Sequence, residues 1–218
     1  MFSKTPLIRR LILLGTPLTL TILMLFHPWP YSDVLGQLVP IAGWWTTLHT
    51  LQFILFAFMG AAVWLMTDGL WGVDVIISRV GALVFAIFYN IGDAVAGIST
   101  GLLALSIADA PSGEQATAMA GAIETLFRDP IKSLFFAIGQ YGWDVALIAA
   151  AVALYRARAP RVPLVLLALP VILIRYDHAV PYGSLTFGSF FVIALWLELS
   201  SFRSSSEPAA PKPAGSAT

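Results

Sequence analysis

The chain has 218 residues, of which 58% are hydrophobic and 11% are charged, whereas soluble domains carry roughly 25% charged residues. Its 12 basic and 12 acidic residues balance, so no net charge attracts nucleic acid, and we expect no such partner. The absence of cysteine excludes disulfides, thiolate nucleophiles and cysteine-held metals. This composition predicts an all-α integral membrane protein whose main partner is the lipid bilayer.

Apolar stretches long enough for membrane helices follow one another along the chain, since crossing a bilayer takes about 20 residues. We expect six transmembrane spans, near Leu11–Phe26, Trp45–Met66, Val80–Ala108, Ser133–Tyr155, Val162–Ile174 and Tyr182–Ser201. The fifth is short and contains Pro163 and Pro170, so it is expected to be tilted, kinked or half-spanning.

The basic residues predict the orientation of this bundle, because short cytoplasmic loops are enriched in Lys and Arg. With both termini inside, nine of the 12 basic residues face the cytoplasm. The sequence therefore predicts a six-helix, N-in/C-in bundle over residues 1–203, in a plasma (inner) membrane. Residues 204–218, rich in Ser, Pro and Ala, are expected to be a disordered cytoplasmic tail.

The outer loop between spans three and four contains a helix signal. Ser112, Gly113, Glu114 and Gln115 fit a capping box, and apolar residues follow at helical spacing from Met119 to Phe127. We expect a short amphipathic helix on the outer surface.

All three histidines fall on the outer side in this topology. His27 ends span one, His49 begins span two and His178 precedes span six. Three neutral imidazoles can hold a divalent metal such as zinc and leave a fourth position for a water that ionises near pH 7. Asp93 or Asp177 is a candidate to orient a histidine or complete the site. Against this stands a simpler interpretation, in which the rings only occupy the membrane interface.

Span three carries the most informative pattern. Asp93, Gly97 and Gly101 repeat every four residues and share one face, with Asn90 one turn earlier. Small residues allow close helix contact, and carboxylates in lipid face the bundle interior. Asp144, Gln140 and Gln52 are further intramembrane polar residues. They indicate a polar interior that is either a proton or ion relay, a substrate site or histidine support, or a packing network.

Residues 97–101 also fit the G-x-S-x-G pattern of a serine nucleophile, with Ser99 as a candidate catalytic residue and His178 as its partner. Six spans with a glycine-flanked serine and an outer histidine are similar to the rhomboid intramembrane proteases. However, Thr100 stands where that family has its second glycine, and the serine is on span three rather than on the fourth core helix. The family is therefore not assigned.

Three functional hypotheses remain open at this point. The leading one is a metal-binding and hydrolytic pocket at the outer face, built from His27, His49, His178 and Asp93. The second is a proton- or cation-coupled transporter or channel component that uses Asp93 and Asp144. The third is a non-catalytic membrane partner protein, in which these residues only stabilise helix packing.

Overall fold

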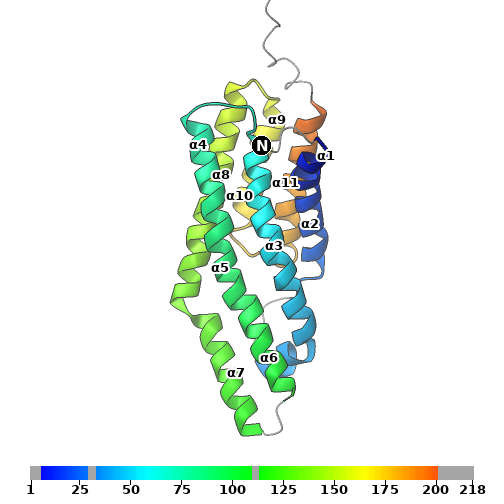
Figure 1. The fold of residues 1–218 in the computed structure, drawn as a ribbon, viewed down its shortest axis with the longest axis vertical. Helices are drawn as coiled ribbons and strands as arrows, with labels where there is room; N and C mark the ends of the chain where they lie inside the picture. Colours follow the sequence, from blue (N-terminus) through cyan, green and yellow to red (C-terminus); the bar gives the residue numbers. More distant parts are fainter. Residues whose placement is uncertain (1–5, 29–32, 110–112, 201–218) are drawn as a thin grey trace, which may run out of the picture.

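The computed structural model describes residues 6–28, 33–109 and 113–200. Every regular element in these ranges is helical, as the composition predicts. The helices form an elongated bundle and run mostly along its long axis (Figure 1). The expected cytoplasmic tail, 204–218, lies outside the described residues, as does Ser112 of the expected capping box.

The helices include several short π-helical turns, which are labelled η. In chain order the elements are α1 (Pro6–Arg10), η2 (Leu11–Gly15), α2 (Thr16–Leu25), η3 (Val34–Leu38), the 3-10 turn η4 (Val39–Ile41), α3 (Ala42–Met66), α4 (Val73–Val84), η5 (Phe85–Tyr89), α5 (Asn90–Asp93), η6 (Ala94–Ser99), α6 (Thr100–Ala108), α7 (Gly113–Arg128), α8 (Pro130–Arg156), α9 (Arg161–Leu166), α10 (Ala168–Leu173) and α11 (Tyr182–Leu199).

Within the described residues, five helical runs are long and apolar enough to cross a membrane. They are Leu7–Leu25, Val34–Met66, Val73–Ala108, Gly113–Arg156 and Tyr182–Leu199. The protein is therefore a multi-pass helical membrane protein. The sixth crossing and the N-in/C-in orientation stay predictions.

The expected fifth span is a shorter, broken helix. It covers Arg161–Leu173 and is interrupted at Leu167 between α9 and α10. Each half has a proline in its first turn, Pro163 in α9 and Pro170 in α10, where the missing N–H is not needed. At 1.5 Å per residue this segment is about 20 Å long, which is less than the bilayer core of about 30 Å.

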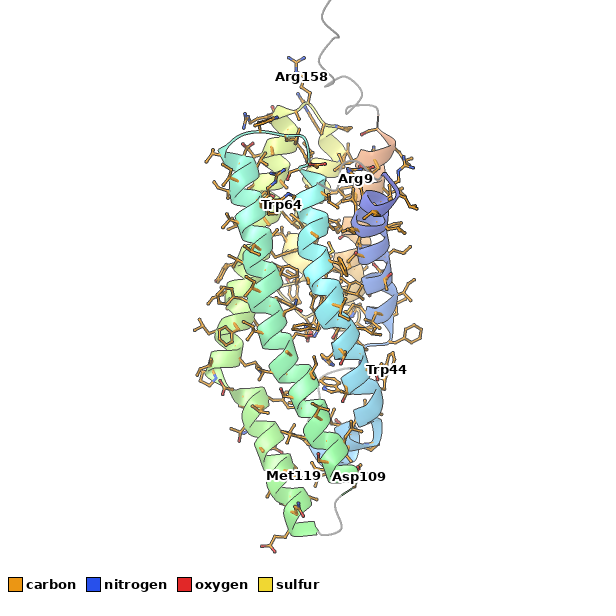
Figure 2. All side chains as sticks on the ribbon, in the orientation of Figure 1. Arg9, Trp44, Trp64, Asp109, Met119 and Arg158 are labelled. Carbon is orange, nitrogen blue, oxygen red and sulfur yellow. The ribbon has the colours of Figure 1, made fainter. Side chains whose placement is uncertain are left out.

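The first and last long helices meet at one end of the bundle. Arg9 donates two hydrogen bonds of 2.6 Å to the carboxylate oxygens of Glu198. Arg9 and Arg158 lie at this end in Figure 2, whereas Asp109 and Met119 lie at the other. The described beginning and end of the chain are therefore on the same side of the bundle.

Close backbone contact joins α4 and the following turn η5 to α8. A Cβ atom added to Gly81 would lie 2.7 Å from the carbonyl oxygen of Gly142, and one added to Gly139 would lie 2.4 Å from the amide nitrogen of Tyr89. No side chain fits between these helices, so glycine is required at the contact.

The far end of the bundle extends beyond α2 and α11. The beginning of α3, together with α6 and α7, continues past the point where α2 ends (Figure 1). This extension has its own apolar core, which includes Leu38, Ala104 and Ile123. The expected amphipathic helix is present as α7, but it runs along α6 rather than across the end of the bundle.

Candidate metal centre

The three histidines converge at the level where α2 ends and α11 begins. His27 lies two residues beyond α2, His49 lies in α3, and His178 lies in the connection between α10 and α11. Each ring offers one nitrogen atom, and these three atoms all lie within 4.8 Å of one another. Segments far apart in the sequence thus form one group that can hold a metal ion.

Backbone carbonyl oxygens fix the tautomers of two of these rings. His27 Nδ1 lies 2.7 Å from the oxygen of Pro28, and His49 Nδ1 lies 2.8 Å from that of Trp45. A carbonyl oxygen only accepts hydrogen bonds, so each Nδ1 carries the hydrogen. Each Nε2 therefore keeps a free lone pair, an arrangement typical of metal-binding histidines.

The Asp177 carboxylate lies beside Nδ1 of the third ring, that of His178. Its Oδ1 atom lies 3.6 Å from His178 Nδ1 and accepts a hydrogen bond of 2.9 Å from the amide of Ala179. Asp177 would support hydrogen on Nδ1 when Nε2 of His178 binds a metal, and Asp93 lies at a similar distance on the Nε2 side of the ring.

Contacts with α8 and α11 hold the loop that carries His178 and the helix α10 before it. Arg175, three residues before the histidine, donates a hydrogen bond to Asp144 of α8, and Trp143 Nε1 donates one of 3.0 Å to the oxygen of Pro170. A Cβ atom on Gly183 would lie 1.7 Å from the oxygen of His178. The first turn of α11 can therefore lie against this loop only because glycine stands there.

Asp93 lies beside the histidines and is completely buried. Its Oδ1 atom is 3.5 Å from His178 Nε2 and 4.0 Å from His49 Nε2. Neither carboxylate oxygen has a hydrogen-bond donor among the described residues, and the same holds for Nε2 of His27 and of His178. Buried polar atoms are nearly always paired, so four unpaired atoms beside one another require an explanation.

Small residues bring Asp93 and its helix against α3. A Cβ atom on Gly97 would lie 2.0 Å from His49 Cδ2, and one on Gly101 would lie 2.3 Å from Thr46 Oγ1. This confirms that the face shared by Asp93, Gly97 and Gly101 meets another helix. Asp93 also stands between two π-helical turns, η5 and η6, a feature frequent at functional sites.

Burial favours the neutral form of the two histidines outside the helical spans. Loss of solvent lowers the pKa of His178 to about 3, and the nearby His27 lowers it further. Loss of solvent also lowers the pKa of His27, although its bond to the Pro28 oxygen opposes this shift. Both rings are therefore neutral at pH 7, as metal ligands must be.

A cavity of about 290 Å³ opens beside the three histidines. Lys132 and Asp177 add charged groups to its wall, and the remaining lining is largely aromatic or small. These other lining residues are Trp45, Ala96, Phe127, Phe136 and Ala179. A larger groove of about 660 Å³ lies between α8 and α9–α10, but it is lined almost entirely by apolar side chains and does not include the histidines.

The other predicted polar residues do not form one network with Asp93. Asp144 pairs with Arg175, Gln52 donates to the sulfur of Met24 at 3.3 Å, and Asn90 donates to the backbone oxygen of Ala86. Gln140 is partly buried in α8 and does not line the cavity.

Ser99, the serine of the G-x-S-x-G pattern, is exposed in η6 and is not among the residues that line the cavity. The structure thus does not bring it to the histidines.

Sequence reasoning missed Lys132 and Trp45. Lys132 lies in the first turn of α8, close after the capping residue Asp129, where a cation is unfavourable. Trp45 lies one turn before His49, against which its ring packs at 4.2 Å between centroids. An unusual charge at a helix start was the available signal for the lysine, whereas the tryptophan resembled an ordinary interface residue.

Comparisons with known proteins add no relative: no protein-family model, no curated protein and no solved structure matches this chain.

Proposed function

We propose that the protein is a membrane-embedded metalloprotein that binds a divalent transition metal through Nε2 of His27, His49 and His178. The observation that carries this proposal is the group of four buried atoms without donors: Nε2 of His27 and of His178, and both oxygens of Asp93. Buried polar atoms without hydrogen-bond partners are unfavourable. A bound cation would stabilise all of them at once.

The donor set favours zinc. Three imidazole nitrogens and a nearby carboxylate suit Zn²⁺, and the chain has no cysteine to provide thiolates. Zinc binds such nitrogens at about 2.0–2.1 Å, so the rings would draw together on binding. A fourth position would then face the cavity and accept water.

The proposed chemistry is hydrolysis of an ester by a metal-activated water. Zinc lowers the pKa of bound water to about 7, and Asp93 would accept one proton from it. With the metal bound, the water oxygen would bond to the carbonyl carbon or phosphorus while the bond from that atom to the leaving oxygen breaks, and Asp93 would give the proton to the leaving oxygen. Asp177 is the positioning residue for His178.

The transport hypothesis uses Asp93 and Asp144 together, but these two carboxylates contact different groups. Asp93 lies against the histidines, whereas Asp144 forms an ion pair with Arg175. The two carboxylates therefore serve different neighbours.

The test is elemental analysis of full-length protein purified in a non-ionic detergent. We expect close to one zinc per chain in the wild type, and its loss in His27→Ala, His49→Ala and His178→Ala. Ser106→Ala is the matched control, because Ser106 is exposed and bonds only to the backbone of its own helix.

A further variant, Asp93→Asn, tests hydrolysis separately from metal binding. Asp93→Asn should keep at least part of the metal and lose hydrolysis of a chromogenic ester. Histidine variants that fold and retain stoichiometric zinc would disprove the metal site. A wild-type protein that is loaded with zinc but has no esterase activity would disprove the proposed hydrolysis and leave the metal site in place.

A further inference from the structure

Lys132 adds a positive charge to the cavity wall beside the candidate metal centre. It is partly buried, and its ammonium group donates a hydrogen bond to the backbone oxygen of Phe127. The same ammonium lies 5.9 Å from the centre of the Phe127 ring. One internal bond leaves two of the three ammonium hydrogens for a ligand.

The position of this lysine is unfavourable for the helix itself. Asp129 caps α8 by accepting hydrogen bonds from the amides of Ile131 and Lys132. A cation in the first turn opposes the dipole of α8, whereas the bond to the Phe127 oxygen places the same cation at the carboxyl end of α7, where it is favourable. The lysine also lines the cavity, where its remaining hydrogens can meet a ligand.

With a divalent metal bound, the charges around the cavity do not balance. The metal and Lys132 contribute two and one positive charges, whereas Asp93 and Asp177 contribute one negative charge each. The sum is one positive charge in a partly enclosed space. An anionic ligand would neutralise it, and phosphate or carboxylate oxygens can bind both a metal and an ammonium group.

The remaining wall suits an apolar group. Trp45, Phe127 and Phe136 line the same cavity, and Phe136 is stacked on His178 at 6.1 Å between ring centroids. The cavity volume of about 290 Å³ is at the lower end of ligand pockets. It accommodates a head group and the first part of a chain.

Resting on the metal site proposed above, we propose that the cavity binds an anionic amphiphile. Lys132 and the metal would hold its phosphate or carboxylate group, while the aromatic wall receives the adjoining chain. The substrate class of the proposed hydrolase is therefore an ester with an acidic head group.

The test uses full-length protein loaded with Co²⁺, whose visible absorption reports ligands that enter the metal's surroundings. Three probes separate the contributions: hexyl phosphate has the anion and the chain, inorganic phosphate only the anion, and hexanol only the chain. We expect hexyl phosphate to change the spectrum at the lowest concentration. Lys132→Gln should weaken its binding about tenfold or more, as loss of a charge-assisted hydrogen bond does. Lys132→Arg should retain most of the affinity.

Each result decides one point. Hexanol binding as tightly as hexyl phosphate, or equal affinity in Lys132→Gln and wild type, would overturn the anion site. Inorganic phosphate binding as tightly as hexyl phosphate would overturn the amphiphile and indicate a free anion. If the protein binds no Co²⁺, the proposed metal site is refuted, and the proposal of an anionic amphiphile is refuted with it.

Discussion

Gly97→Ala should damage the candidate metal centre without altering any of its ligands. The added Cβ atom would lie 2.0 Å from Cδ2, 2.1 Å from Cγ and 2.5 Å from Cβ of His49. Carbon atoms in contact are about 3.5–4.0 Å apart, so the His49 ring or the whole helix must move by about 1.5–2 Å. Overpacking of this kind lowers the free energy of unfolding by about 1–3 kcal/mol. We also expect zinc affinity to fall by about tenfold or more, as when a residue supporting a metal ligand is replaced.

The matched control is Gly121→Ala. Gly121 lies inside α7 and has no atom within 4 Å of the added Cβ, so the substitution should be neutral or stabilise the protein by up to about 1 kcal/mol. Zinc titration and thermal unfolding in detergent measure both effects. If Gly97→Ala binds zinc like the wild type, the contact between Gly97 and His49 does not position the ligand. If only Gly121→Ala is destabilising, the packing argument itself is wrong.

Two ion pairs provide further predictions. Asp144→Asn should lower stability by about 1–2 kcal/mol, because the partner Arg175 is half exposed. The same variant should weaken zinc binding because the His178 loop loses its tether; unchanged zinc affinity would show that the loop holds its position without the pair. A double-mutant cycle on Arg9→Gln and Glu198→Gln should give a coupling energy of about 1–3 kcal/mol, since both partners are largely buried. The exposed Arg10 is the control, and a coupling energy near zero would mean that the pair does not join the two ends.

The helical class and the long apolar runs were predictable because lipid imposes them on the sequence. A helix that crosses a bilayer must be apolar over about 20 residues, and this constraint is local. The broken fifth segment shows the limit of that logic. Pro163 and Pro170 indicated an interruption, but only the folded chain shows that each proline lies in the first turn of a separate short helix.

The histidines illustrate a different limit. The sequence provided three candidate ligands and predicted a common side for them, yet no spacing rule connects positions 27, 49 and 178. Their convergence depends on Gly97 and Gly183, which allow neighbouring segments to touch His49 and His178. Ser99 shows the converse case, since a five-residue pattern suggested a nucleophile and the folded chain leaves this serine exposed and outside the lining of the cavity.

Removal of the metal should lower the thermal stability of the zinc-loaded protein. The three ligands come from just beyond α2, from α3 and from the loop before α11, so a bound metal would directly link three segments that are far apart in the sequence. A ligand that binds only the folded protein stabilises it by about 2.7 kcal/mol when its free concentration is 100 times the Kd. Chelation should therefore lower the unfolding temperature of the zinc-loaded protein, and added zinc should restore it. His49→Ala provides the control, because a chain without the site should unfold at the same temperature with and without chelator. Equal sensitivity to chelator in wild type and His49→Ala would show that the stabilising metal binds somewhere else.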